Sequence, residues 1–196
     1  WLNETGAKYP VEVAIHKDNV LLTIDTSGSG LNKRGYRLAQ GEAPIKETLA
    51  ASLIRLANWK GDSPLIDPFC GSGTIAIEAC LIAQNIAPGF NRDFVSEEWN
   101  IMPPNIYDEL RDEADRMADY DKEIEVYASD IDPEMVEIAK RNAEEVGLGD
   151  IIQFNVKDVN TLTIDSEGPV ALVGNPPYGE RIFDREEVEE MNRYIV

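Results

Sequence analysis

The sequence is poor in histidine, cysteine and basic residues. Its 196 residues include one histidine, His16, two cysteines, Cys70 and Cys80, and 18 lysines and arginines against 37 acids. With so few His and Cys side chains we expect no metal site and no Ser-His-Asp triad. Two cysteines on one strand–loop–helix segment favour a reduced, cytoplasmic protein over a disulfide framework. No apolar run is long enough to span a bilayer and no signal peptide is visible, so no membrane partner is expected.

The net charge of −19 is unevenly distributed along the chain. Residues 1–60 carry eight Lys/Arg and six Asp/Glu, a net +2, and the remainder carries ten against 31, a net −21. The acids are densest between Asp93 and Asp150, in stretches that indicate solvated helix faces. RNA contacts are therefore expected from the N-terminal part, from the mouth of a site, or from a domain outside this sequence.

The order of elements predicts an α/β fold. The alternating runs VEVAIHK and VLLTIDT predict an N-terminal β-hairpin, and a Gly-rich linker, SGSGLNKRGYRLAQGEAP, follows it. Strands within PLIDP, IEVYASDID, IIQFNVKD and VALVGN then alternate with helices, with an insertion over about 86–121. This alternation of strands and helices is typical of a Rossmann-like, doubly wound, mostly parallel sheet with helices on both faces. We expect residues 1–42 to form the hairpin and linker, and residues 43–196 the α/β domain.

A glycine loop, DPFCGSGT, runs from Asp67 to Thr74 where the first strand meets the first helix. Glycines there allow a tight turn and let a ligand approach the backbone at a helix N-terminus. No Lys follows the glycines, as a phosphate-binding loop would require. A third glycine is absent, and the next strand-end acid, Asp130, lies about sixty residues on rather than about twenty, so a dinucleotide oxidoreductase is disfavoured.

Three aspartates stand at later strand ends. Asp130 could accept hydrogen bonds from both hydroxyls of a ribose lying across the switch point of the sheet. Asp132 precedes Pro133 and is better explained as a helix N-cap. Asp158 could accept from an adenine amino group, or could simply end its strand.

The fourth strand runs into Asn175-Pro176-Pro177-Tyr178. The two prolines fix φ and lack an N–H, so this tetrapeptide predicts a stiff, extended turn. A lone Pro-Pro could merely end a strand. The other motifs decide between that interpretation and a functional one.

The motifs DPFCGSGT, SDID, KD and NPPY, in this order on successive strand ends, resemble class I S-adenosylmethionine-dependent methyltransferases that act on amino groups. Together with SGSGLNKRGYR, APIKETLAASLI, IAPGFNRDF and GNPPYGERI they resemble bacterial THUMP-containing 23S ribosomal RNA guanine-N2-methyltransferases. The resemblance implies S-adenosylmethionine as cofactor, S-adenosylhomocysteine as product and ribosomal RNA as partner. It also implies an RNA-binding THUMP domain before Trp1 and further sheet strands after Val196.

The resemblance also implies a set of site residues. Asn175 and Pro176 would offer oxygen acceptors to the target amine, held by the rigid turn, and Tyr178 would stack on a flipped base. Gly71 and Gly73 would lie against the methionine part of the cofactor, so that Gly73→Val would abolish binding and leave the fold largely intact. The expected catalytic residues are Asn175, Pro176, Pro177 and Tyr178. The expected cofactor-binding residues are Asp67, Phe69, Cys70, Gly71, Ser72, Gly73, Thr74, Asp130, Ile131, Asp158, Val159 and Asn175.

Three alternatives stay open at this point. NPPY also suits a methyltransferase acting on DNA adenine or protein glutamine, although the hairpin and SGSGLNKRGYR favour RNA. A nucleotide-binding module without chemistry is the second, and the intact Asn175 and glycine loop argue against it. The third is the dinucleotide oxidoreductase that the spacing of glycines and acids already disfavours. Cys70 could be suspected as a nucleophile, but its place in the cofactor loop favours a packing role.

Overall fold

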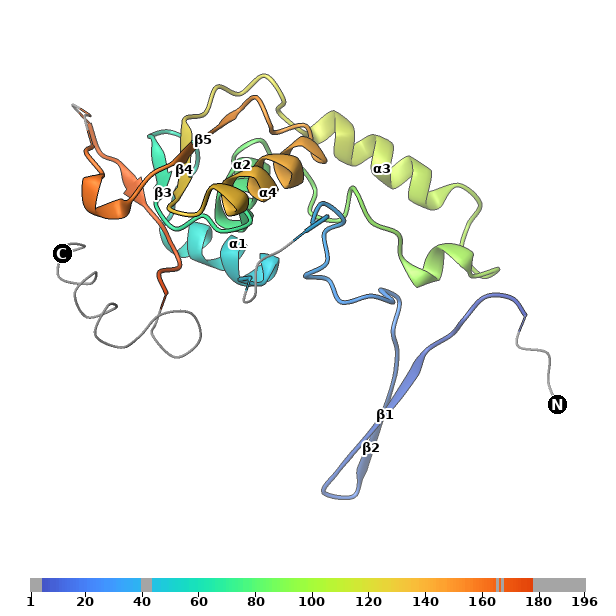
Figure 1. The fold of residues 1–196 in the computed structure, drawn as a ribbon. Helices are drawn as coiled ribbons and strands as arrows, with labels where there is room; N and C mark the ends of the chain where they lie inside the picture. The colour runs from blue at the N-terminus through green and yellow to red at the C-terminus, as the bar shows by residue number, and fades with distance from the viewer. Residues whose placement is uncertain (1–4, 40–43, 165, 167, 178–196) are drawn as a thin grey trace.

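The computed structural model describes residues 5–39, 44–164, 166 and 168–177. An α/β body carries a parallel sheet and three helices packed on it, and a two-stranded hairpin projects away from this body (Figure 1). The expected fold class, α/β with a Rossmann-like parallel sheet and an N-terminal hairpin, is confirmed.

The hairpin pairs β1 (Val11–His16) with β2 (Asn19–Ile24) in antiparallel register. Its two-residue turn has positive φ at both central positions, as the right-handed twist of hairpin strands favours. Every residue of both strands is exposed. The register places six aliphatic side chains on one face, namely Val11, Val13, Ile15, Val20, Leu22 and Ile24.

The insertion holds the base of this hairpin. Trp99 stacks on Tyr9 with ring centroids 4.9 Å apart and donates from its indole N–H to the Lys8 carbonyl at 2.7 Å. Ser96, in the 3-10 helix η1 (Val95–Glu98), donates to the Thr26 carbonyl at 2.9 Å. Both strands of the hairpin are thus attached where they meet the body.

The sheet contains β3 (Leu65–Asp67), β4 (Val126–Asp130), β5 (Ile152–Val156) and β6 (Ala171–Leu172). Its order is β5-β4-β3-β6, and every neighbouring pair is parallel. The chain therefore builds outward from β3 to β5 and then returns to the other side of β3. The switch point between β3 and β6 is where sheets of this kind place their ligands.

The helices α1 (Glu47–Leu56), α2 (Thr74–Ala83) and α4 (Pro133–Glu144) form the layer over this sheet (Figure 1). Right-handed crossovers through α2 and α4, both advancing in the same direction along the sheet, put these two helices on one face. On the opposite face Gln153 is exposed and Leu172 is 47% exposed. We expected helices on both faces of the sheet. Within the described residues, helices cover one face.

The acidic stretch of the insertion forms α3 (Ile106–Met117), which buries none of its residues. This confirms the expectation of a solvated helix. Arg111 of α3 donates to Glu97 in η1 at 2.6 Å. No helix in the part of the chain that the structure describes is long and apolar enough to cross a membrane.

Candidate functional site

The glycine loop crosses from the end of β3 to the end of β4 and is held there by backbone contacts. The Cys70 N–H donates to the Ser129 carbonyl at 2.9 Å, and the Gly71 N–H donates to Asp130 Oδ2 at 2.9 Å. The Gly73 N–H closes the turn onto the Cys70 carbonyl at 2.8 Å. The loop and the first strand-end acid therefore lie in direct contact at the carboxyl edge of the sheet.

The two loop glycines face different surroundings. Gly71 has φ +50°, and a Cβ added there would meet no atom within 4 Å, so its exposed side is open to a ligand. Gly73 has φ +84°, and its Cβ would lie 3.0 Å from the Ala139 Cβ on α4. The expectation that Gly73→Val leaves the fold intact is therefore wrong, because Gly73 is required by the close approach of α4.

The three strand-end aspartates differ in what already binds them. Asp130 is half-buried and accepts from the Gly71 and Asp132 N–H groups, one on each oxygen. Asp132 accepts from the Glu134 N–H at 2.8 Å as the N-cap of α4, which confirms the capping interpretation. Asp158 caps the 3-10 helix η2 (Val159–Thr161) through a 2.9 Å bond from the Asn160 N–H. A carboxylate has about four acceptor sites, so Asp130 and Asp158 keep capacity for a ligand.

Apolar side chains accompany these acids. Ile131 is 61% exposed directly after Asp130, and Val159 is half-buried directly after Asp158. Phe69, at the other side of the glycine loop, is also half-buried. The carboxyl edge of the sheet thus offers apolar surface beside hydrogen-bond acceptors, a combination that suits a flat, polar-edged ligand.

The turn after β6 lies against the start of the glycine loop. A Cβ at Gly174 would sit 3.3 Å from Pro68 and from Phe69, so the two chain segments approach closely here. Asn175, Pro176 and Pro177 are half-buried, and within the described residues the Asn175 amide makes no hydrogen bond. Tyr178, expected to stack on the base, lies outside the described residues.

Asp67 is fully buried at the end of β3. Its Oδ1 accepts from the Phe69 N–H at 3.2 Å, and its Oδ2 has no partner among the described residues. Burial, with a smaller contribution from the nearby Asp130 charge, raises the pKa of this carboxyl from 3.8 to about 7. Asp67 Oδ2 is thus a buried acceptor beneath the glycine loop. Such an acceptor suits a ligand that carries a positive charge.

The remaining loop side chains point into the protein. Cys70, Ser72 and Thr74 are buried, and desolvation of the Cys70 thiol raises its pKa, which argues against a thiolate nucleophile. Thr74 Oγ1 accepts from the Arg37 guanidinium at 2.9 Å. The side chains of Ser72 and Thr74 are therefore packed inside the protein rather than turned toward open space.

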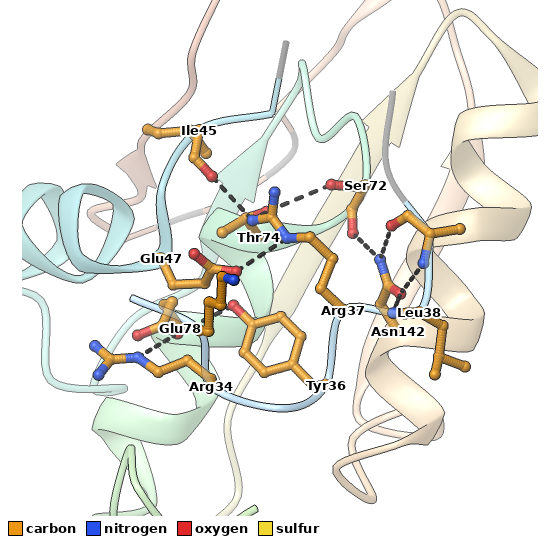
Figure 2. A network of polar contacts seen from close by, with 12 residues as sticks. Arg34, Tyr36, Arg37, Leu38, Ile45, Glu47, Ser72, Thr74, Glu78 and Asn142 are labelled. Atoms are coloured by element: carbon orange, nitrogen blue, oxygen red, sulfur yellow. Dashed lines mark hydrogen bonds and ion pairs between the residues drawn. The ribbon is translucent and has the colours of Figure 1, made fainter. Parts of the chain in front are cut away.

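Sequence reasoning missed a buried polar network beneath this loop (Figure 2). It joins the linker to the starts of α1 and α2 and to α4, through Arg34, Tyr36, Arg37, Glu47, Glu78 and Asn142. The basic residues of the linker were visible in the sequence, but their buried acidic partners were not, because Glu47 and Glu78 stand in helices like any surface acid. In the residues that the structure describes, no cluster of three or more His, Cys, Asp or Glu side chains could hold a metal.

Comparison with known proteins gives consistent results. The sequence model of a protein family, the RMKL-like methyltransferase domain, matches residues 34–196. YpsC of Bacillus subtilis strain 168, named as an RNA methyltransferase, is 58% identical over 191 residues, which are 97% of this chain and 49% of YpsC. A protein of Shewanella baltica strain OS155 named ribosomal RNA large subunit methyltransferase K/L is 40% identical over 97% of this chain and 27% of its own length.

Two solved structures are also similar. One from Listeria monocytogenes, named as an N6-adenine-specific DNA methylase, has a TM-score of 0.92 at 55% identity, covering 98% of this chain and 50% of that one. Another, named as a methyltransferase in complex with SAH, has a TM-score of 0.88 at 46% identity. The match covers 96% of this chain and 49% of that one. The chain thus spans about half the length, or less, of the relatives it matches.

The raised pKa of Asp67 predicts a pH dependence of stability. Between pH 4 and pH 7 the unfolded carboxyl is ionised and the folded one is protonated, so stability falls as pH rises through this window. We expect the free energy of unfolding of the protein, relative to Asp67→Asn, to fall by about 1 kcal/mol per pH unit there. Urea unfolding at pH 5, 6 and 7 measures the difference. If the free energies of unfolding of the two proteins changed equally with pH, this prediction would be wrong.

The two glycines predict a second, matched pair of effects. Gly73→Ala combines a left-handed backbone with a contact against Ala139, and should lower the free energy of unfolding by about 2–4 kcal/mol. Gly71→Ala meets open space and should cost only about 1–2 kcal/mol, for its backbone conformation. Chemical denaturation of both variants tests the ranking, and an equal loss of stability would refute the assignment of Gly73 to helix packing.

Proposed function

The chain belongs to the RMKL-like methyltransferase domain family, and from this premise we propose that it transfers the methyl group of S-adenosylmethionine to an exocyclic amine of an RNA base. Guanine N2 of large-subunit ribosomal RNA is the acceptor we propose. The names of YpsC and of the K/L relative, which concern RNA and large-subunit ribosomal RNA, support the substrate class. The SAH complex of a 46% identical structure supports the cofactor.

One observation carries the proposal: the Asn175 turn and the glycine loop meet at the switch point. Gly174 packs on Pro68 and Phe69, and β3 and β6 are paired neighbours in the sheet. A cofactor on the loop and an amine at the turn would then share one edge of the sheet. Direct transfer between two bound groups requires such proximity.

On the cofactor side, the residues present fit S-adenosylmethionine. We propose that the open face of Gly71 takes the methionine part and that Asp130 accepts from the ribose hydroxyls. The adenine would lie beside Ile131 and Val159, with Asp158 accepting from its amino group. The buried Asp67, whose Oδ2 has no partner among the described residues, lies beneath, where its ionised form would favour a cationic ligand. Phe69, Cys70, Ser72, Gly73 and Thr74 complete the loop, contributing through backbone and packing.

On the acceptor side, the Asn175 amide oxygen and the Pro176 carbonyl would accept hydrogen bonds from the target amine. The lone pair of that amine is delocalised into the base, so acceptors that favour a tetrahedral nitrogen increase its nucleophilicity. S-adenosylmethionine supplies an activated methyl group: the nitrogen forms the new C–N bond, the C–S bond breaks to S-adenosylhomocysteine, and the amine proton leaves to water. Pro176 and Pro177 hold the acceptors rigidly, which is how preorganised polar groups stabilise developing charge.

A methyltransferase acting on DNA adenine is the second candidate, and the name of the Listeria structure favours it. The Asn175 turn suits either planar amine. The hairpin and the basic linker before the body support the RNA interpretation, because residues 1–60 carry the positive part of an otherwise acidic chain. We further propose a cytoplasmic setting, in keeping with two free, buried cysteines.

The proposed function is tested with the complete natural protein, labelled S-adenosylmethionine, and unmodified ribosomal RNA, with adenine-containing DNA as the competing substrate. We expect label in RNA, and mapping of the methylated nucleoside to N2-methylguanosine. Label in DNA alone would replace the RNA proposal with the second candidate. Label in neither substrate, with no binding of the cofactor, would refute methyl transfer by this chain.

Asn175→Ala tests the acceptor side directly. Removing one preorganised acceptor should lower single-turnover methyl transfer by about 10²–10³-fold. RNA affinity should change far less than turnover, and the melting temperature should change little, since within the described residues the amide holds no other group. A folded variant with near-normal turnover would show that the turn merely ends β6.

A further inference from the structure

The linker that joins the hairpin to the body does more than connect them, because its residues Arg34 to Ala39 bind across the start of α2 (Figure 2). These residues lie outside the set proposed above to touch the cofactor or the base. Arg37 of the linker contacts Thr74 directly, and Asn142 of α4 joins the linker to the Ser72 carbonyl. Ser72 and Thr74 are the two residues that flank Gly73 in the glycine loop.

Arg37 makes the contact on one side. Its Nη2 donates to Thr74 Oγ1 and to the Ile45 carbonyl, both at 2.9 Å, and its Nε lies 3.0 Å from Glu47 Oε1. The side chains of Arg37 and Glu47 are only 15% and 6% exposed. One guanidinium thus ties the segment before α1, the first residue of α1 and the first residue of α2 together. Its planar fork suits this task, and a lysine ammonium would not reproduce it.

Asn142 of α4 makes the contact on the other side. Its Nδ2 donates to the Ser72 carbonyl at 3.0 Å and to the Ala39 carbonyl at 3.1 Å, and its Oδ1 accepts from the Leu38 N–H at 2.9 Å. Asn142 is 1% exposed. The residues that follow Arg37 are therefore fixed to the same loop through a second, neutral side chain.

The start of α2 has no side-chain N-cap. Its N-cap is Gly73, which has no side chain to bond the free N–H groups of the first turn. From this we infer that Arg37 is a positioning residue for the cofactor loop: by holding Thr74 it fixes the backbone N–H groups that the cofactor meets. The inference rests on the proposed function only in naming S-adenosylmethionine as the ligand of that loop.

The same linker offers a matched control. Arg34 lies 3.4 Å from Glu78 Oε1, and that buried carboxylate also accepts from the Tyr36 hydroxyl at 3.0 Å. Glu78 stands one turn further along α2 than Thr74, away from the loop. Arg34 thus shares the segment, the charge and a buried acidic partner with Arg37, and among the described residues it makes no contact with the loop.

The experiment compares Arg37→Lys with Arg34→Lys in the complete natural protein. Both keep a cation near the buried acid, so both should fold. Arg37→Lys should weaken S-adenosylmethionine binding by about 10–100-fold in calorimetry, raise KM for the cofactor to match, and leave kcat at saturating cofactor within about threefold. Arg34→Lys should change cofactor affinity by less than about threefold. The two variants should lower the melting temperature by similar amounts.

Hydrogen exchange without cofactor provides a readout that is independent of binding. The Gly73 amide is bonded to the Cys70 carbonyl, so it should exchange faster in Arg37→Lys and at the original rate in Arg34→Lys. Equal exchange and equal affinity in the two variants would overturn the inference and leave the proposed function standing. If the unchanged protein failed to bind S-adenosylmethionine, the proposed function would fall, and exchange at Gly73 would still decide the role of Arg37.

Discussion

The parallel pairing of β3 with β6 is the contact on which the candidate site depends. The Ala171 N–H bonds to the Pro64 carbonyl at 2.9 Å and the Val173 N–H to the Ile66 carbonyl at 3.0 Å. Because the carboxyl ends of parallel strands meet at one edge, this register brings the turn after Val173 onto the loop after Ile66. About a hundred residues of chain separate the two segments, and the backbone pairing of these strands places them in contact. The rest of the sheet positions acids along the same edge.

The polar residues beneath the glycine loop differ from the acids of the surface. Glu47 and Glu78 are buried beside arginines of the linker, Glu47 at 3.0 Å from Arg37 and Glu78 at 3.4 Å from Arg34. Burial still raises the pKa of Glu78, and the Arg34 charge opposes that rise. Asp67 is buried without such a partner, and its pKa is raised to about 7. The two glutamates near the loop thus have cationic neighbours, whereas among the described residues Asp67 has none.

The insertion between β3 and β4 fixes the N-terminal segment. Arg92 is 8% exposed and donates to four linker carbonyls, those of Ser27, Ser29, Gly30 and Lys33, at 2.7–3.3 Å. With the stacking of Tyr9 on Trp99, these contacts hold the hairpin base and linker in place, and the linker in turn reaches Thr74 through Arg37. A continuous path of contacts therefore runs from the projecting hairpin to the glycine loop. It gives the basic N-terminal part of the chain a physical connection to the site.

The sequence by itself determined the elements and their order, because local patterns set them: alternation predicted β1 and β2, apolar runs bounded by turn residues predicted β3 to β6, and Asp132 before Pro133 predicted the cap of α4. It also located the two motifs that meet at the switch point. It did not predict the packing at Gly73, where Ala139 of α4 lies against the position that a Cβ would take. It gave no sign that Arg37, Glu47 and Asn142 hold the loop, because burial and partners across long sequence separations arise only when the helices pack. The tertiary structure decided those roles, since whether a side chain is buried or solvated depends on which distant segments cover it.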